Sequence, residues 1–134
     1  MSQENVEIVR RGFEGFARTG DFDLELFDPE VEFDNSNAML DAAIYRGPEG
    51  LREYLSLMRD MWKQVRFEPQ EYIPVGEDRV VVRTRMIVVG RDEIETVARG
   101  ANVFTLRDGK VTHLKAFQSK APTPSKPLGF RSRR

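Results

Sequence analysis

The sequence predicts an α+β fold in which helices cover one face of an antiparallel sheet. Before residue 63 the apolar residues recur at spacings of three and four, which is typical of amphipathic helices. From Val65 onward apolar and polar residues alternate, and three turn sequences divide this part of the chain into four strands. Because all helices precede these strands, we expect them to pack on one sheet face, and strands this long should curl.

Three helices are expected before the long strands. The first spans about 2–19, where Val and Phe residues form one apolar face and Gly20 supplies a stop. The acidic stretch 21–28 carries four apolar residues and ends at Pro29, which suits a short second helix docked under the first. The third is expected over about 47–62, where a Gly-Pro pair supplies the cap and the first helical position.

Five strands are expected, the first a short one from Val31 to about Asp34. The other four cover 66–74, 80–89, 94–107 and 110–119. The last two flank Asp108-Gly109, and an Asp-Gly pair between alternating segments is the strongest short hairpin sequence. Three consecutive turns therefore predict an antiparallel meander of the four long strands.

Length and composition fit a single domain. We expect this domain to cover 1–121. The remaining segment, 122–134, has the sequence PTPSKPLGFRSRR, and the chain has no acidic residue after Asp108. This composition predicts a disordered basic tail.

Composition also excludes several classes of site and partner. The chain contains no cysteine and a single histidine, His113, which excludes disulfides, thiolate metal sites and a histidine-rich metal centre. A formal net charge of −1 argues against nucleic acid as a partner. No apolar run of 18 residues occurs, and the first residues, MSQENVEIVRRG, lack the pattern of a signal peptide. We therefore expect no membrane association and a cytoplasmic location.

Three sequence strings occur in an order that resembles the nuclear-transport-factor-2-like (NTF2-like) superfamily, especially its SnoaL-like bacterial members. They are DPEVEF, YRGPEGLREYL and VFTLRDGKVTHLKAF, and the likeness covers about 4–118. The resemblance implies a cone-shaped fold, in which the curled antiparallel sheet wraps around about three N-terminal helices and encloses a pocket. The superfamily includes ketosteroid isomerase, limonene-epoxide hydrolase, scytalone dehydratase, polyketide cyclases and pocket proteins with no known reaction. The fold therefore does not settle the function.

Asp34 is a candidate general base at the end of the short strand. Ketosteroid isomerase has a Val-Glu-Asp string at this strand, whose Asp is the base. An ungapped match places that Asp on Phe33, so Asp34 takes the role only through a shift of one residue. As a base, Asp34 should have a pKa raised by burial. Alternatively, Asp34 caps the following loop with its own side chain, and if the strand keeps its pleat, Phe33 lines the cavity.

Asn102 is a candidate donor to a ligand oxygen. It shares a strand face with Gly100 and Phe104, and this small, polar face is unusual for a core. Its distance from the Asp108-Gly109 turn resembles that of the protonated Asp in the oxyanion hole of ketosteroid isomerase, a known example of a neutral carboxylic acid that donates a hydrogen bond. An amide can donate without a raised pKa, or it can bind a buried water or backbone group.

This chain lacks at least one catalytic residue of each of three enzymes in the superfamily. Phe13 stands where the isomerase has its oxyanion tyrosine, and it cannot donate. Leu114-Lys115-Ala116 replaces the His-Trp-Asp that is typical of polyketide cyclases. The Asp-Arg-Asp relay of limonene-epoxide hydrolase has no counterpart, since the one carboxylate in the last three expected strands is that of Glu95, which lies close to a turn.

Two hypotheses about function follow. The first is a small-molecule pocket protein that binds a compact hydrophobic ligand. The alternative is an isomerase or proton-transfer enzyme that acts on a carbonyl compound, with Asp34 as base and Asn102 as donor. Neither requires a cofactor or a metal ion. The expected ligand-binding residues are Phe13, Phe33, Tyr54, Leu55, Met86, Phe104, Leu114 and Gln118, with Tyr54 serving either as a donor or as core packing.

A homodimer through the outer sheet face is also expected. Apolar residues take the face opposite the cone interior, and no helix remains to cover them: Val81, Ile87, Val89, Val97, Val103 and Phe117. His113 shares that outer face, and the three bases interspersed there, Arg83, Arg85 and Arg99, suit the rim of a dimer interface better than a nucleic-acid surface.

Overall fold

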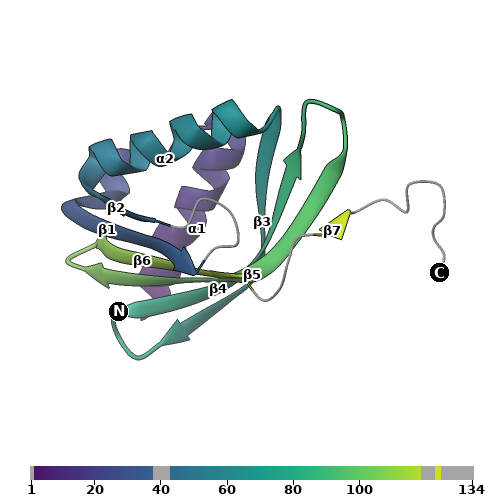
Figure 1. Ribbon diagram of the computed structural model, residues 1–134. Helices are drawn as coiled ribbons and strands as arrows, with labels where there is room; N and C mark the ends of the chain where they lie inside the picture. Colours follow the sequence, from purple (N-terminus) through teal and green to yellow (C-terminus); the bar gives the residue numbers. More distant parts are fainter. Residues whose placement is uncertain (1, 38–42, 119–122, 125–134) are drawn as a thin grey trace.

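Two α-helices and a curled, unclosed sheet make up the computed structural model, which describes residues 2–37, 43–118 and 123–124 (Figure 1). Helix α1 (Ser2–Thr19) packs against strands β3 (Gln64–Val75) and β4 (Arg79–Val89). Helix α2 (Gly47–Met61) packs against the two strands at the other side of the sheet. The α+β class is confirmed.

The first predicted helix is confirmed, and both of its ends have a local cause. Gly20 adopts a φ of 80°, and its N–H donates to the carbonyl of Phe16 at 2.7 Å, so the helix stops there. Near the other end, the buried amide of Asn5 donates to the backbone oxygen of Glu77 at 2.9 Å. This hydrogen bond fixes the start of α1 to the turn between β3 and β4.

The second predicted helix is wrong. Residues 21–28 contain only one three-residue 3₁₀ turn, η1 (Leu24–Leu26), which Asp23 caps by accepting the N–H of Glu25 at 3.2 Å. Strand β1 (Phe27–Asn37) begins directly afterwards, because Phe27 already pairs with Val111. The acidic stretch therefore leaves no room for an α-helix, and the expected strand from Val31 starts earlier.

The sheet has the strand order β2-β1-β6-β5-β4-β3, where β2 is Ile44–Arg46, β5 is Glu95–Arg107 and β6 is Lys110–Gln118. The antiparallel meander from β3 to β6 is confirmed, with strand ends within two residues of those predicted. However, β1 pairs with β6 in parallel, so the sheet is mixed rather than antiparallel. β1 and β6 are far apart in the sequence, so no hairpin turn forces them to run antiparallel.

Strand β7 (Thr123–Pro124) pairs with β5 beyond the end of β6. Gln118 of β6 lies opposite Gly100, and Thr123 lies opposite Val97, so β7 continues along the same edge of β5. These two residues fall in the segment expected to be a tail, 122–134. The other residues of that segment lie outside the described residues.

The curl of the sheet brings β5 and β6 very close together at Gly100. A Cβ atom added there would lie 1.9 Å from the backbone oxygen of Phe117. Only glycine fits, which explains why a strand interior contains this residue. On the free edge of the sheet, β3 carries Pro69 and Pro74, neither of which has a backbone N–H.

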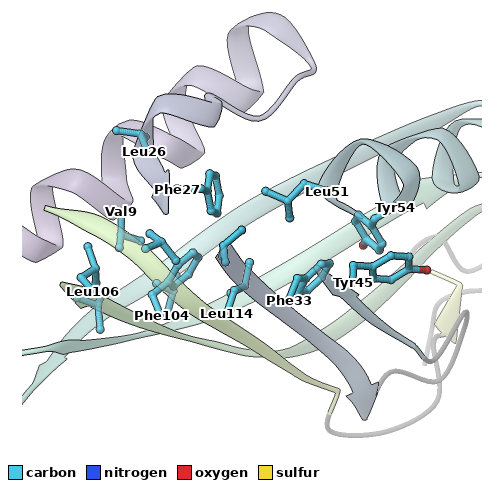
Figure 2. Packing of buried hydrophobic residues seen from close by; sticks show 14 of the residues in the cluster. Val9, Leu26, Phe27, Phe33, Tyr45, Leu51, Tyr54, Phe104, Leu106 and Leu114 are labelled. Carbon is cyan, nitrogen blue, oxygen red and sulfur yellow. The ribbon is translucent and has the colours of Figure 1, made fainter. Parts of the chain in front are cut away.

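The core lies between the helices and the concave face of the sheet (Figure 2). Val31, Val80 and Val82 are fully buried there. At one end, the rings of Phe33 and Tyr54 meet edge to face with centroids 4.8 Å apart, and Tyr45 stacks on Phe33 at 5.9 Å. Each such pair adds about 0.5–1.5 kcal/mol to the burial of its apolar area. This aromatic cluster fixes α2 on β1 and β2.

Candidate functional site

A cavity of about 110 Å³ opens between α1, η1, α2 and the concave face of the sheet. Its volume is on the scale of the roughly 150 Å³ cavity known to accept benzene. Apolar side chains dominate its wall, and the rings come from both helices, from the segment before η1 and from three strands: Phe13, Phe16, Phe22, Phe27, Phe33, Tyr54, Phe67 and Phe104. The site is therefore suited to a compact, flat, largely apolar ligand.

A band of four neutral polar side chains crosses the floor of this pocket. One residue comes from each of four neighbouring strands, β1, β6, β5 and β4: Asn35, Gln118, Asn102 and Thr84. Thr84 and Gln118 both lie opposite Gly100 across β5, and Asn102 lies two residues further along the same face. The four residues, called the polar band below, give the apolar pocket hydroxyl and amide groups but no charge.

Two members of the polar band are directly hydrogen-bonded. The Nδ2 of Asn102 donates to Oγ1 of Thr84 at 3.4 Å, and Oγ1 of Thr84 donates to the backbone oxygen of Val82 at 3.1 Å. Thr84 is only 8% exposed and Asn35 only 5%. These two members are thus part of the packed floor, while Asn102 and Gln118 are half-buried.

Eight of the ten site residues expected from the sequence line the pocket: Phe13, Phe33, Tyr54, Met86, Asn102, Phe104, Leu114 and Gln118. Leu55 does not, and it lies buried in the core cluster. It follows Tyr54 on α2, and one residue of an α-helix turns the side chain by about 100°. When Tyr54 faces the pocket, Leu55 must therefore face elsewhere.

Asp34 is the other exception, and its assignment as general base is corrected. Strand β1 keeps its pleat at this point, so Phe33 and Asn35 line the pocket and the side chain between them lies on the opposite face. The carboxylate of Asp34 accepts both the N–H of Ser36 at 2.9 Å and its hydroxyl at 2.5 Å. Asp34 therefore caps the backbone at Ser36, near the end of β1.

The pKa of Asp34 is lowered, not raised as a buried base would require. The hydroxyl of Ser36 is the main cause, followed by its backbone N–H, because both hydrogen bonds favour the ionised form. Lys115, with its Nζ 4.0 Å from Oδ2, lowers the pKa further, while partial burial opposes these effects. The carboxylate is therefore ionised at neutral pH and directed away from the pocket.

Few groups in the pocket wall can transfer a proton. Among the described lining residues, only Asp23 and Tyr54 have titratable side chains. Asp23 caps η1 near the start of β1, whereas Asn35 of the polar band lies near the end of that strand.

The described residues also contain no group of three or more potential metal ligands from His, Asp and Glu. Nor does any described helix combine the length and apolar character of a membrane span.

The sequence analysis missed Thr84 and Asn35 as site residues. Thr84 alternates in phase with Val82 and Met86, both on the inner face of β4, so its parity alone could have identified it. Asn35 could have been found in the same way, from its phase with Val31 and Phe33. His113 is exposed on the outer face, as its parity predicted.

Sequence and fold comparisons agree with this geometry. Residues 9–114 match the family model described as the SnoaL-like domain. No protein with curated annotation is detectably similar in sequence. Many solved structures share the fold. TerC, crystallised with polyporic acid, is 24% identical, and the alignment covers 87% of this chain and 92% of that one with a TM-score of 0.74.

Two further structures extend the comparison. Bal32a, from a soil-derived mobile gene cassette, is 18% identical over 89% of this chain and 92% of its own, with a TM-score of 0.78. An NTF2-like protein of unknown function from Burkholderia pseudomallei is 19% identical over 87% and 91%, with a TM-score of 0.73. The family match over most of the chain leads to one conclusion: the protein belongs to the SnoaL-like family.

Proposed function

We propose that the protein binds a compact aromatic ligand in the pocket, with the polar band recognising a neutral oxygen group on it. The observation that carries this proposal is the combination of an aromatic wall with neutral hydrogen-bonding groups on four adjacent strands. Aromatic rings pack well against a flat ligand, and a few directed polar groups in an apolar cavity set its orientation. TerC, a structural relative, was crystallised with polyporic acid, so the fold can be studied with a small molecule bound.

The charge of the pocket wall narrows the ligand class. The described lining residues include no Lys, Arg or His, and their one carboxylate is Asp23. An anionic ligand would lose its hydration without gaining a cationic partner, which is costly in an apolar cavity. A neutral ligand loses much less, so we propose a neutral one.

The alternative function, proton transfer with Asp34 as base, is not retained. The carboxylate of Asp34 accepts hydrogen bonds from Ser36 and lies on the face away from the pocket. Asn102 remains in the site, but as a binding residue.

We also propose that two chains pair through the outer sheet face. Val81, Val103 and Lys115 lie opposite one another across β4, β5 and β6, and Phe117, 40% exposed, is the next outward residue of β6. The apolar patch is smaller than expected from the sequence, because Ile87 and Val97 are already 1% and 4% exposed within one chain. Light scattering at micromolar concentration should give the mass of two chains, and the mass of one would refute the pairing.

The binding proposal is tested by filling the cavity. Isothermal titration calorimetry with 2-naphthol should detect binding to the wild type and none to Ala116→Leu, whose longer side chain occupies the pocket. The matched control is Lys115→Leu, which places the same side chain on the next residue of β6 but on the outer face. It should bind 2-naphthol like the wild type.

Thermal melts of both variants confirm that they fold. Equal binding by folded Ala116→Leu and wild type, or no binding by the wild type, would refute the proposed function. Extraction of the denatured protein and mass spectrometry would then identify any ligand carried from the expression host.

A further inference from the structure

The hydroxyl of Thr84 has a single proton, and the structure accounts for it. This proton is donated to the backbone oxygen of Val82, 3.1 Å from Oγ1. Toward Asn102, 3.4 Å away, the hydroxyl can therefore act only as an acceptor. If the amide of Asn102 were turned round, its oxygen would face the lone pairs of Thr84 without a proton between them. The chemistry of Thr84 thus decides which end of the amide faces it.

This orientation determines what Asn102 offers to the pocket. One N–H is used by Thr84, so the carbonyl oxygen and the second N–H of Asn102 remain for other partners. Within residues 2–37, 43–118 and 123–124, the bond to Thr84 is the one hydrogen bond of the Asn102 side chain. Asn102 is half-buried and lines the pocket, so its free acceptor and donor are available to a ligand.

We infer that Thr84 is a positioning residue, which holds Asn102 so that the pocket presents an acceptor and a donor together to a hydroxylated aromatic ligand. The inference rests on the proposed function and makes it more specific. A ligand hydroxyl matches this pair, because the same group can donate to the carbonyl oxygen of Asn102 and accept from its N–H. Gly100 lies opposite Thr84 on β5 and presents no side chain between the ligand and the polar band.

The test uses two probes of nearly the same shape, 2-naphthol and 2-methylnaphthalene. Thr84→Val keeps the shape of the side chain and removes the hydroxyl, while Thr84→Ser keeps the hydroxyl. We expect Thr84→Val to weaken the binding of 2-naphthol about fivefold to tenfold, the usual effect of one hydrogen bond. Binding of 2-methylnaphthalene should change less than about twofold, and Thr84→Ser should restore the affinity for 2-naphthol.

A ligand-free measurement keeps the inference testable on its own. In a ¹H–¹⁵N NMR spectrum, the side-chain NH₂ signals of Asn102 should shift in Thr84→Val and return in Thr84→Ser.

Three results would overturn the role of Thr84 while leaving the proposed function in place. They are equal losses for both probes in Thr84→Val, unchanged binding of 2-naphthol, or unchanged NH₂ signals of Asn102. Failure of both probes to bind the wild type would instead refute the proposed function, and this inference with it.

Discussion

The two faces of the same strands have different chemistry. On the inner face, β4 and β5 carry Val80, Val82 and Phe104 with the neutral Thr84 and Asn102. On the outer face, charged pairs join these two strands to β3: Arg83 of β4 with Glu71 at 2.7 Å, and Glu95 of β5 with Arg66 at 3.5 Å. The side chains of these pairs are partly or largely exposed, so each pair contributes at most about 1 kcal/mol. Stability and the pocket both come from the inner face, and one residue along a strand separates the two environments.

The largest expected effect comes from adding a side chain at Gly100, on the inner face of β5. Gly100→Ala forces its Cβ against the oxygen of Phe117, which belongs to the backbone and cannot move alone. We expect the free energy of unfolding to fall by about 3 kcal/mol, at the upper end of overpacking costs. Urea denaturation measures it.

Gly15→Ala is the control, because an added Cβ there meets nothing closer than 4.0 Å within α1. It should raise stability by up to about 1 kcal/mol, since alanine favours a helix over glycine. A Gly100→Ala variant as stable as the wild type would show that β6 can move away from β5.

A second pair of variants compares the two faces directly. Val82 is 0% exposed on the inner face, and its neighbour Val81 is half-buried on the outer face. Val82→Ala should cost about 2 kcal/mol, from two lost methylene equivalents and the cavity left behind. Val81→Ala should cost well under about 1 kcal/mol in the single chain. Similar losses in urea denaturation would mean that the outer face is as well packed as the core, either within one chain or in the proposed pair of chains.

The smallest expected effect concerns Asp34. Its pKa is lowered from the ordinary Asp value of 3.8 in the folded chain, so its ionised form stabilises the fold above that value. This stabilisation is lost as the pH falls through the lower, folded pKa. Asp34→Asn should therefore cost less than about 1 kcal/mol at pH 7, given the exposure of Lys115, and the difference from wild type should vanish in acid.

This outcome is opposite to that expected of a functional base, whose replacement should leave stability unchanged or raise it. Urea denaturation of wild type and Asp34→Asn at pH 7 and below pH 3.8 measures the difference. A stabilised Asp34→Asn variant at pH 7 would contradict the role of Asp34 as the hydrogen-bond acceptor for Ser36.

The sequence predicted the meander well, because its strands alternate strictly and the Asp-Gly turn allows few alternatives. Parity also placed Asn102, Phe104 and Leu114 correctly on the inner face. The segment before β1 failed because its apolar residues suit either a helix or an extended chain. Its conformation is decided by the distant pairing of Phe27 with Val111, which no local pattern contains.

The site was only partly predictable for a related reason. Asp34 was selected for its chemistry, although the phase of Val31 and Phe33 already placed it opposite them. Thr84 has no conspicuous chemistry, and its importance comes from Asn102, a neighbour 18 residues away. Relations of this kind appear only once the strands are aligned side by side.

The prolines of β3 affect whether molecules at high concentration can aggregate through the edge of the sheet. The sheet does not close into a barrel, so β3 ends it with one row of backbone groups that β4 does not use. Such a row can template the addition of a strand from another molecule, the first step toward fibrils. Pro69 and Pro74 interrupt β3 with positions that cannot donate, so neighbouring molecules cannot extend the sheet there in an unbroken ladder. The two prolines of β3 therefore protect this edge of the sheet, at the opposite end from β2, against polymerisation.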